Sequence, residues 1–258
     1  MESYIKKIFV MLKMDLIEWT RVKVAIIVSL LQPIVMVVAF GLSSLHGGFD
    51  FVYSLPGILA IAVMFSTTFS AGFGTISDRE RRLVDDIVLS PVGYSAFIIS
   101  RLLGTIIKCI LPTGGALIIA LFFFDANVYH FMPIISAYIL MSIICSGLGM
   151  MVGAFTNHLA FEGTVNFFLI PSMFFGGIFF PIDSLGTFGH VVRYFAITPA
   201  VEIFRYGLNN NLVVGTLLSN YIILLIYAII FAVSKSLIGL FNLYFCSVNN
   251  FPSAAKIS

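Results

Sequence analysis

Long apolar runs separated by short polar stretches dominate the chain. A membrane-spanning α-helix needs about 20 mostly apolar residues, because its backbone polar groups must be satisfied within the segment. Six runs meet this requirement: residues 24–42, 55–75, 96–124, 133–155, 163–180 and 216–233. Arg101, Lys108 and Pro112 interrupt the third run. The pattern predicts an all-α membrane protein with six transmembrane helices in a single domain over residues 1–258.

The composition agrees with a chain that faces lipid. Hydrophobic residues make up 60% of the sequence and charged residues 10%, whereas soluble domains average about 45–50% apolar and about 25% charged residues. So few charges could not cover a water-soluble fold, and the apolar content excludes disorder. A net charge of +2 does not indicate a nucleic-acid partner. The three cysteines, Cys109, Cys145 and Cys246, have no metal-site or disulfide spacing.

The distribution of Lys and Arg predicts the orientation. Basic residues concentrate before the first span and between the second and third spans, whereas residues 43–54 and 125–132 contain neither Lys nor Arg. Cytoplasmic loops carry the excess of positive charge. We therefore expect both termini on the cytoplasmic side of a bacterial inner membrane, with Arg193 and Arg205 as mild exceptions. The N-terminus does not read as a cleaved signal peptide, because charged residues continue through Lys23.

Residues 4–19 form an amphipathic pattern. One helix face gathers Ile5, Ile8, Phe9, Leu12, Leu16 and Trp19, and the other carries Lys6, Lys7, Lys13 and Glu18. Such a helix can lie in the headgroup plane with its lysines near anionic lipids. The alternative is a helix that packs on the protein itself.

Residues 77–90, SDRERRLVDDIVLS, are the most informative polar segment. Ser77 and Glu80 have the spacing of a capping box, and Pro91 ends the pattern. We expect a short cytoplasmic helix, either solvated or docked into a groove of a partner protein. The candidate docking residues are Arg79, Glu80, Arg81, Arg82, Leu83, Asp85, Asp86 and Ile87.

The connection between spans five and six is too long and too apolar for an ordinary loop. Prolines and glycines divide residues 181–215 into short pieces, and irregular backbone at membrane depth needs cover from protein. We predict a re-entrant helical hairpin or an outer cap. Its candidate residues are Pro181, Asp183, Arg193, Pro199, Glu202 and Arg205.

No nucleotide, metal or nucleophile motif occurs in the sequence, including GxxxxGK[ST], GxGxxG, HExxH and GxSxG. We expect no enzymatic activity, no metal site and no bound cofactor in this chain. His158 and Glu162 are four residues apart, and three interpretations remain for them: polar groups at a helix end, a proton relay, or a contact with a partner or neighbouring helix.

Two motifs resemble the type-2 ABC exporter permeases. ISDRERRLVDDIVLSPVGYSAFIISRLLG is similar to the family's acidic–basic helix before span three, and FFGGIFFPIDSLGTFGHVVRYFAITPAVEIFRYG is similar to its outer-loop signature. The plan of six spans with an amphipathic N-terminal helix also resembles that of the family. Thr198 precedes Pro199 where the family often has Asn, and the first span lacks the aromatic pattern of O-antigen exporters, which favours the drug, lipid or Nod-factor type.

The resemblance implies a mechanism. Residues 77–90 would be the coupling helix, and two copies of the chain would pair above two ABC ATPase subunits that bind ATP and Mg²⁺. The pathway would carry an amphipathic drug, lipid or glycan-linked substrate outward. Its polar candidates are Ser66, Thr67, Ser70, Thr164 and Asn166. The competing readings are a gradient-driven carrier or channel, and a membrane enzyme or assembly factor.

Overall fold

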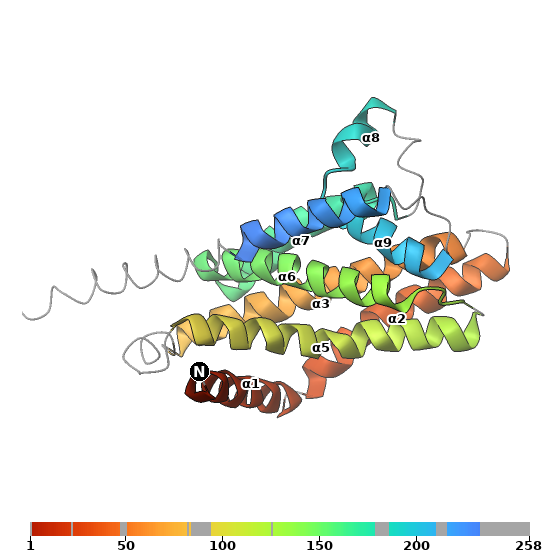
Figure 1. Ribbon diagram of the computed structural model, residues 1–258. Coiled ribbons are helices and arrows are strands. Elements are labelled where there is room, and N and C mark those ends of the chain that lie inside the picture. Colours follow the sequence, from red (N-terminus) through yellow and green to blue (C-terminus); the bar gives the residue numbers. More distant parts are fainter. Residues whose placement is uncertain are drawn as a thin grey trace, which may run out of the picture.

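The computed structural model describes residues 2–21, 23–46, 51–81, 83, 94–124, 126–178, 186–209 and 216–232. These residues form helices and connections without strands. The labelled helices in Figure 1 are α1 (Glu2–Arg21), α2 (Lys23–Leu45), α3 (Phe51–Glu80), α5 (Tyr94–Phe123), α6 (Phe131–Phe155), α7 (His158–Phe175), α8 (Thr187–Val192) and α9 (Ile197–Asn209). A further helix covers Thr216–Ala232.

Helix α3 is the centre of the bundle. It packs against α2, α5, α6, α7 and α9, and residues 54–64 are buried on every side, including Ile58, Leu59 and Val63 at 0% exposure. A helix that is apolar all round belongs in the interior of a bundle. The long run of Leu, Ile, Ala and Val before Phe65 therefore explains why this helix takes the central position.

Two glycines bring α6 directly onto α3. A Cβ at Gly149 would lie 2.2 Å from the carbonyl oxygen of Thr68, and a Cβ at Gly153 would lie 2.7 Å from that of Gly72. Small residues allow such backbone contact between membrane helices, where packing replaces the hydrophobic effect as the driving force. The side of α3 that carries Thr68 and Gly72 therefore faces α6.

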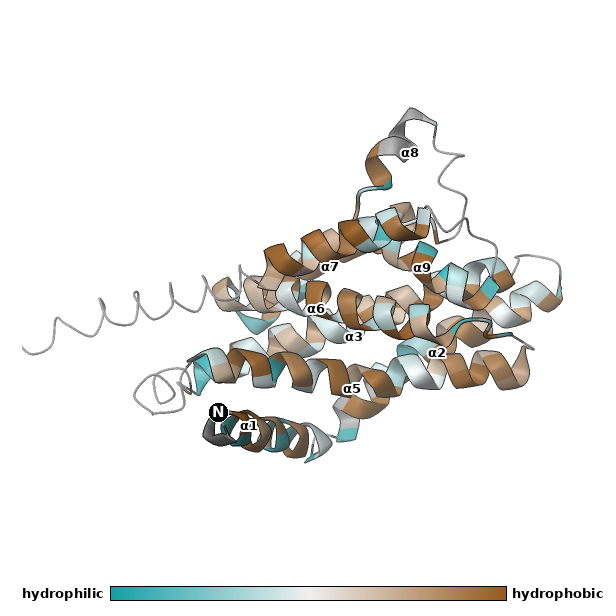
Figure 2. Cartoon of the chain, viewed as in Figure 1, coloured by the Kyte–Doolittle hydropathy of each residue, from teal (hydrophilic) through white to brown (hydrophobic). Residues whose placement is uncertain are grey.

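Three described helices are long and apolar enough to cross a membrane: Phe51–Glu80, Ser95–Phe123 and Phe131–Phe155. Apolar side chains remain on the outside, such as Phe122 at 80% and Leu159 at 94% exposure, and Figure 2 shows hydrophobic colouring along much of the length of the helices. The predicted all-α chain is confirmed in the described residues. The count of six spans and the re-entrant hairpin remain predictions.

Two predicted boundaries differ from the structure. Helix α3 continues to Glu80, so Ser77 lies inside its last turn and the capping box expected at Ser77 is wrong. The amide of Arg81 still donates to the carbonyl of Ser77 at 3.0 Å. Helix α7 begins at His158 instead of residue 163, after Thr156 and Asn157 in extended conformations. The remainder of the predicted coupling helix, residues 82 and 84–90, lies outside the described residues.

Helix α1 packs along α5 (Figure 1). Residues 4–19 therefore pack on the protein itself, as in the second of the two interpretations of this segment. Ile5, Phe9 and Met14 of α1 nevertheless stay 62%, 64% and 67% exposed. Apolar side chains that stay exposed beside Lys6 and Lys13 are compatible with contact to lipid headgroups. At the other side of the bundle, α9 packs on α3 and α6.

Candidate functional site

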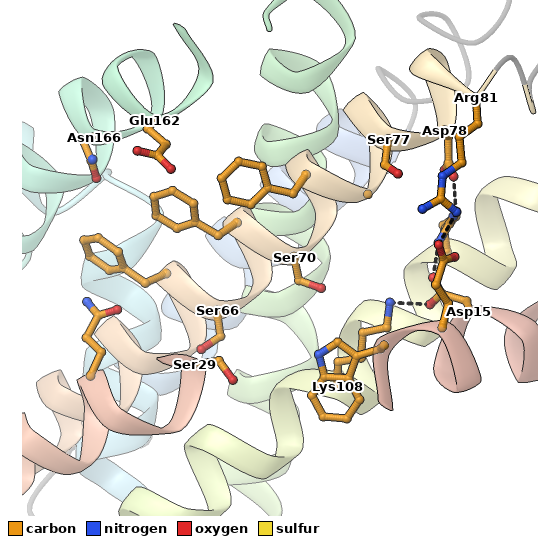
Figure 3. Close-up of a pocket in the computed structure, with 18 residues that line it drawn as sticks. Asp15, Ser29, Ser66, Ser70, Ser77, Asp78, Arg81, Lys108, Glu162 and Asn166 are labelled. Atoms are coloured by element: carbon orange, nitrogen blue, oxygen red, sulfur yellow. Dashed lines mark hydrogen bonds and ion pairs between the residues drawn. The ribbon is translucent and has the colours of Figure 1, made fainter. Parts of the chain in front are cut away.

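A cavity of about 650 Å³ lies among α1, α2, α3, α5 and α7. Ligand pockets for small molecules typically occupy about 300–1,000 Å³, so the space can hold a drug-sized group. In Figure 3, Glu162 and Asn166 lie on one side and Asp15, Asp78, Arg81 and Lys108 on the other. The lining also includes Glu18, Trp19, Ser29, Gln32, Phe65, Ser66, Phe69, Ser70, Phe73, Gly74, Ser77 and Arg101.

Three phenylalanines of α3 form an aromatic wall. Phe65, Phe69 and Phe73 are four residues apart, which places them on one face of the helix, and successive ring centroids are 6.1 and 5.8 Å apart. Phe161 of α7 supports the wall from behind, edge-on to Phe69 at 5.9 Å. Gly72 makes room for it, because a Cβ there would lie 1.9 Å from Phe161 Cζ. The wall is thus packed before any ligand arrives.

The predicted pathway residues divide into two groups. Ser66, Ser70 and Asn166 line the cavity. Thr67 is fully buried and donates to the carbonyl of Val63 at 2.6 Å, and Thr164 donates to the carbonyl of Ala160 at 2.8 Å without lining the cavity. The structure therefore brings together the first three and leaves the two threonines bonded to their own helices.

Four charged side chains close the cavity on the side of α1. Asp15 forms ion pairs with Arg101 and, at 2.7 Å, with Lys108, while Arg101 also pairs with Asp78. Their side chains are only 6–16% exposed. Buried charges are tolerated only when paired. This ionic cluster (Asp15, Asp78, Arg101 and Lys108) is formally neutral and joins α1, α3 and α5.

Gly104 permits the approach of Asp15 to α5. It lies between Arg101 and Lys108 on one face of the helix, since the three residues are spaced i, i+3 and i+7. A Cβ at Gly104 would lie 2.2 Å from Asp15 Oδ2. Arg101 and Lys108 stand out in the sequence as cations within an apolar run, whereas nothing in the sequence marks Asp15 as their partner. The pattern of two cations on one face of an apolar helix, with a glycine between them, indicates a buried carboxylate partner.

The last turn of α3 and the residue after it contact four other helices. Asp78 pairs with Arg101 of α5, Glu80 with His158 of α7 at 3.3 Å, and Arg81 with Glu18 of α1. Arg79 donates to the carbonyls of Ala154 at 2.7 Å and Thr156 at 2.5 Å, at the end of α6. Three of the predicted docking residues, Arg79, Glu80 and Arg81, are therefore engaged within the chain.

Arg79 satisfies carbonyl groups that the end of α6 leaves without helical partners. We expect Arg79→Gln to lower the free energy of unfolding by about 1–3 kcal/mol, the cost of leaving buried polar groups unpaired. Thermal unfolding of the purified chain in detergent measures this loss. Arg81→Gln is the matched control, because its pair with Glu18 is exposed and such pairs contribute at most about 1 kcal/mol. Equal losses in the two variants would contradict a capping role.

His158 and Glu162 have separate environments although both lie in the first half of α7. His158 contacts Glu80 and stacks on Phe73, with ring centroids 5.6 Å apart. Glu162 lines the cavity. Of the three sequence-based interpretations, contact with a neighbouring helix applies to His158, and the proton relay stays untested.

The described outer-cap residues anchor α9 to the bundle. Arg205 pairs with Glu202 at 2.6 Å, donates to the carbonyl of Gly177 at 3.1 Å and lies over the ring of Tyr53 at 4.1 Å. Pro199 is buried in the first turn of α9, where its missing N–H does no harm. Arg193 ends α8. Pro181 and Asp183 lie outside the described residues.

Within the described ranges, no group of three or more His, Cys, Asp or Glu side chains could hold a metal ion. Cys109 and Cys145 are buried thiols, in keeping with small apolar side chains in spans three and four. The described lining offers an apolar aromatic wall, hydroxyl and amide groups, and charges at its rim, all of which can bind a ligand.

Residues 6–209 match the family of ABC-2 type transporters. The matched region runs from within α1 to the end of α9 and contains every residue that lines the cavity. No curated protein matches the chain. The match covers well over half of the sequence and confirms the family suggested by the two sequence motifs. The chain therefore belongs to the ABC-2 type transporters, the membrane permeases of ABC transport systems.

Proposed function

We propose that this chain is the membrane-spanning subunit of an ABC exporter, which moves an amphipathic substrate out of the cytoplasm with ATP hydrolysed by a separate ATPase. Two copies of the chain would pair above two ATPase subunits in a bacterial inner membrane, with both termini cytoplasmic. The chain itself would bind neither ATP nor Mg²⁺. The amphipathic cavity supports the choice of substrate, because one wall is aromatic and the rim is polar and charged.

One observation carries the proposal. Ser77 and Asp78 at the end of α3, and Arg81 directly after it, line the cavity, and these residues also begin the predicted coupling segment 77–90. The contacts of residues 78–81 with α1, α5, α6 and α7 would transmit a displacement of that segment to the helices around the cavity. A packed ionic junction has few intermediate arrangements, which favours switching between discrete states.

The docking of the ATPase can be tested with Leu83→Asp and Ile87→Asp. Leu83 is half-buried, and Ile87 lies outside the described residues. We expect either variant to abolish co-purification of the ATPase while insertion into the membrane is unchanged, because a carboxylate cannot enter an apolar groove without losing its hydration. His46→Asp is the control, since it places the same charge before α3, at the opposite end of that helix. Retained co-purification in both test variants would refute the docking role.

The ionic cluster also raises a second candidate, a carrier driven by an ion gradient, because buried ionisable residues are common in proton pathways. All four of its members are paired with one another, which favours a structural role. Transport by the reconstituted complex distinguishes the two functions. Movement of substrate that continues after ATP depletion but stops when the proton gradient is dissipated would establish the carrier.

A further inference from the structure

We propose that the cavity selects amphipathic cations, with the Glu162 carboxylate as the countercharge and the α3 aromatic wall as the apolar contact surface. The transport of such cations rests on the proposed function, whereas their binding does not. The inference follows from which charges at the cavity are already neutralised and which are not.

The positive charges of the lining are neutralised by the protein. Arg101 pairs with Asp15 and Asp78, Lys108 pairs with Asp15, and Arg81 pairs with Glu18. An anionic ligand would have to displace one of these carboxylates. For the ionic cluster that displacement is costly, because a buried carboxylate would lose its partner.

Glu162 has a different position. Among the described residues it is the one carboxylate of the lining without an ion pair. It lies on α7, across the cavity from Asp15 and Lys108 (Figure 3). With three cationic and four anionic side chains in the lining, namely Arg81, Arg101 and Lys108 against Asp15, Glu18, Asp78 and Glu162, the cavity has an excess negative charge.

The aromatic wall suits the same ligand. The faces of aromatic rings carry negative electrostatic potential and attract cations within about 6 Å. Phe65, Phe69 and Phe73 offer successive rings along α3, and Trp19 adds an indole from α1. Asn166, one turn after Glu162 on α7, supplies an amide oxygen that can accept a hydrogen bond from an ammonium group. The apolar part of an amphipathic cation can therefore contact the aromatic wall, and its positive group can lie beside Glu162 and Asn166.

The test uses two probe ions of nearly equal shape and opposite charge, tetraphenylphosphonium and tetraphenylborate. Their dissociation constants are measured by titration calorimetry on the purified full chain in detergent, with empty micelles subtracted. We expect Glu162→Gln to weaken tetraphenylphosphonium binding about tenfold, because it removes the attraction between the carboxylate and the cation, and to leave tetraphenylborate binding unchanged or stronger. Glu162→Asp should retain most of the affinity for the cation, because it keeps the charge.

Glu80→Gln is the matched control. It removes one negative charge near α7, but Glu80 faces His158 and does not line the cavity, so the affinity for tetraphenylphosphonium should not change. Unchanged binding of the cation in Glu162→Gln, equal loss for both ions, or no binding of the cation by the unmodified chain would overturn the inference.

Binding and transport measurements on the same variants distinguish a failure of the cation selectivity from a failure of the proposed exporter function. If the cation binds through Glu162 but neither stimulates a co-purified ATPase nor is moved in proteoliposomes, the selectivity stands and the exporter function fails. If ATP drives transport but the Glu162→Gln substitution leaves the uptake of cations and anions unaltered, the exporter function stands and the selectivity fails.

Discussion

Asp15→Asn should be among the most damaging single substitutions in this protein. It leaves Arg101 and Lys108 without their shared carboxylate at a site where both cations are largely buried. Removing one member of a buried ion pair typically costs about 3–5 kcal/mol, because the remaining charge keeps its desolvation penalty without the attraction. Thermal unfolding of the chain in detergent should show the loss, and α1 should become accessible to protease as it leaves α5.

Two further variants identify the cause. Glu18→Gln removes a carboxylate one turn away on α1, where the pair with Arg81 is exposed, and should cost at most about 1 kcal/mol. Adding Lys108→Met to Asp15→Asn should restore part of the stability, because it removes the cation that has lost its carboxylate partner, whereas Arg101 keeps Asp78. If Asp15→Asn and Glu18→Gln had equal effects, the ionic cluster would not hold α1 in place.

Gly149→Leu should separate the two central helices. Even a Cβ at this position would lie 2.2 Å from the backbone oxygen of Thr68, and no side-chain rotation can relieve a clash with backbone. Overpacking a core costs about 1–3 kcal/mol and more when the backbone must move. We expect Gly149→Ala to lower the free energy of unfolding by about that amount, and Gly149→Leu to yield no monodisperse protein in size-exclusion chromatography.

Gly114→Ala is the matched control for helix propensity. Gly114 lies within α5, where no heavy atom lies within 4 Å of an added Cβ. Alanine is better than glycine in a helix by about 1 kcal/mol, so this variant should be as stable as the unmodified chain or more stable. A stable Gly149→Leu protein would mean that α3 and α6 do not meet at this glycine.

The sequence alone determined the helical membrane architecture and the family. Apolar runs of spanning length must be helices in lipid, because the backbone has no other partner there, and the described runs became α2, α3, α5, α6, α7 and the helix over Thr216–Ala232. The charged segment that begins in the last turn of α3 and the outer-loop pattern carried the family resemblance, which the match over residues 6–209 confirmed. Ser66, Ser70 and Asn166 line the cavity, and their role in a substrate pathway stays a prediction.

Helix ends were less predictable than helix centres. Ser77 and Glu80 have the spacing of a capping box, but the same residues extend α3 because Asp78 and Arg79 find partners on α5 and α6. A capping signal is local and weak, so ion pairs and hydrogen bonds to neighbouring helices can override it. The start of α7 at His158 has a similar origin, since the contact between His158 and Glu80 lies in its first turn.

Only the tertiary structure decided which charges are neutralised and which face the cavity. Hydrophobic periodicity tells which side of a helix is apolar, but it contains no information about the helix that will pack there. Asp15 and Arg101 are 86 residues apart in the chain, and their pairing depends on α1 lying along α5 over Gly104. The position of Glu162 as the one carboxylate of the described lining without an ion pair could be found only after the neighbouring cations had been assigned their partners in space.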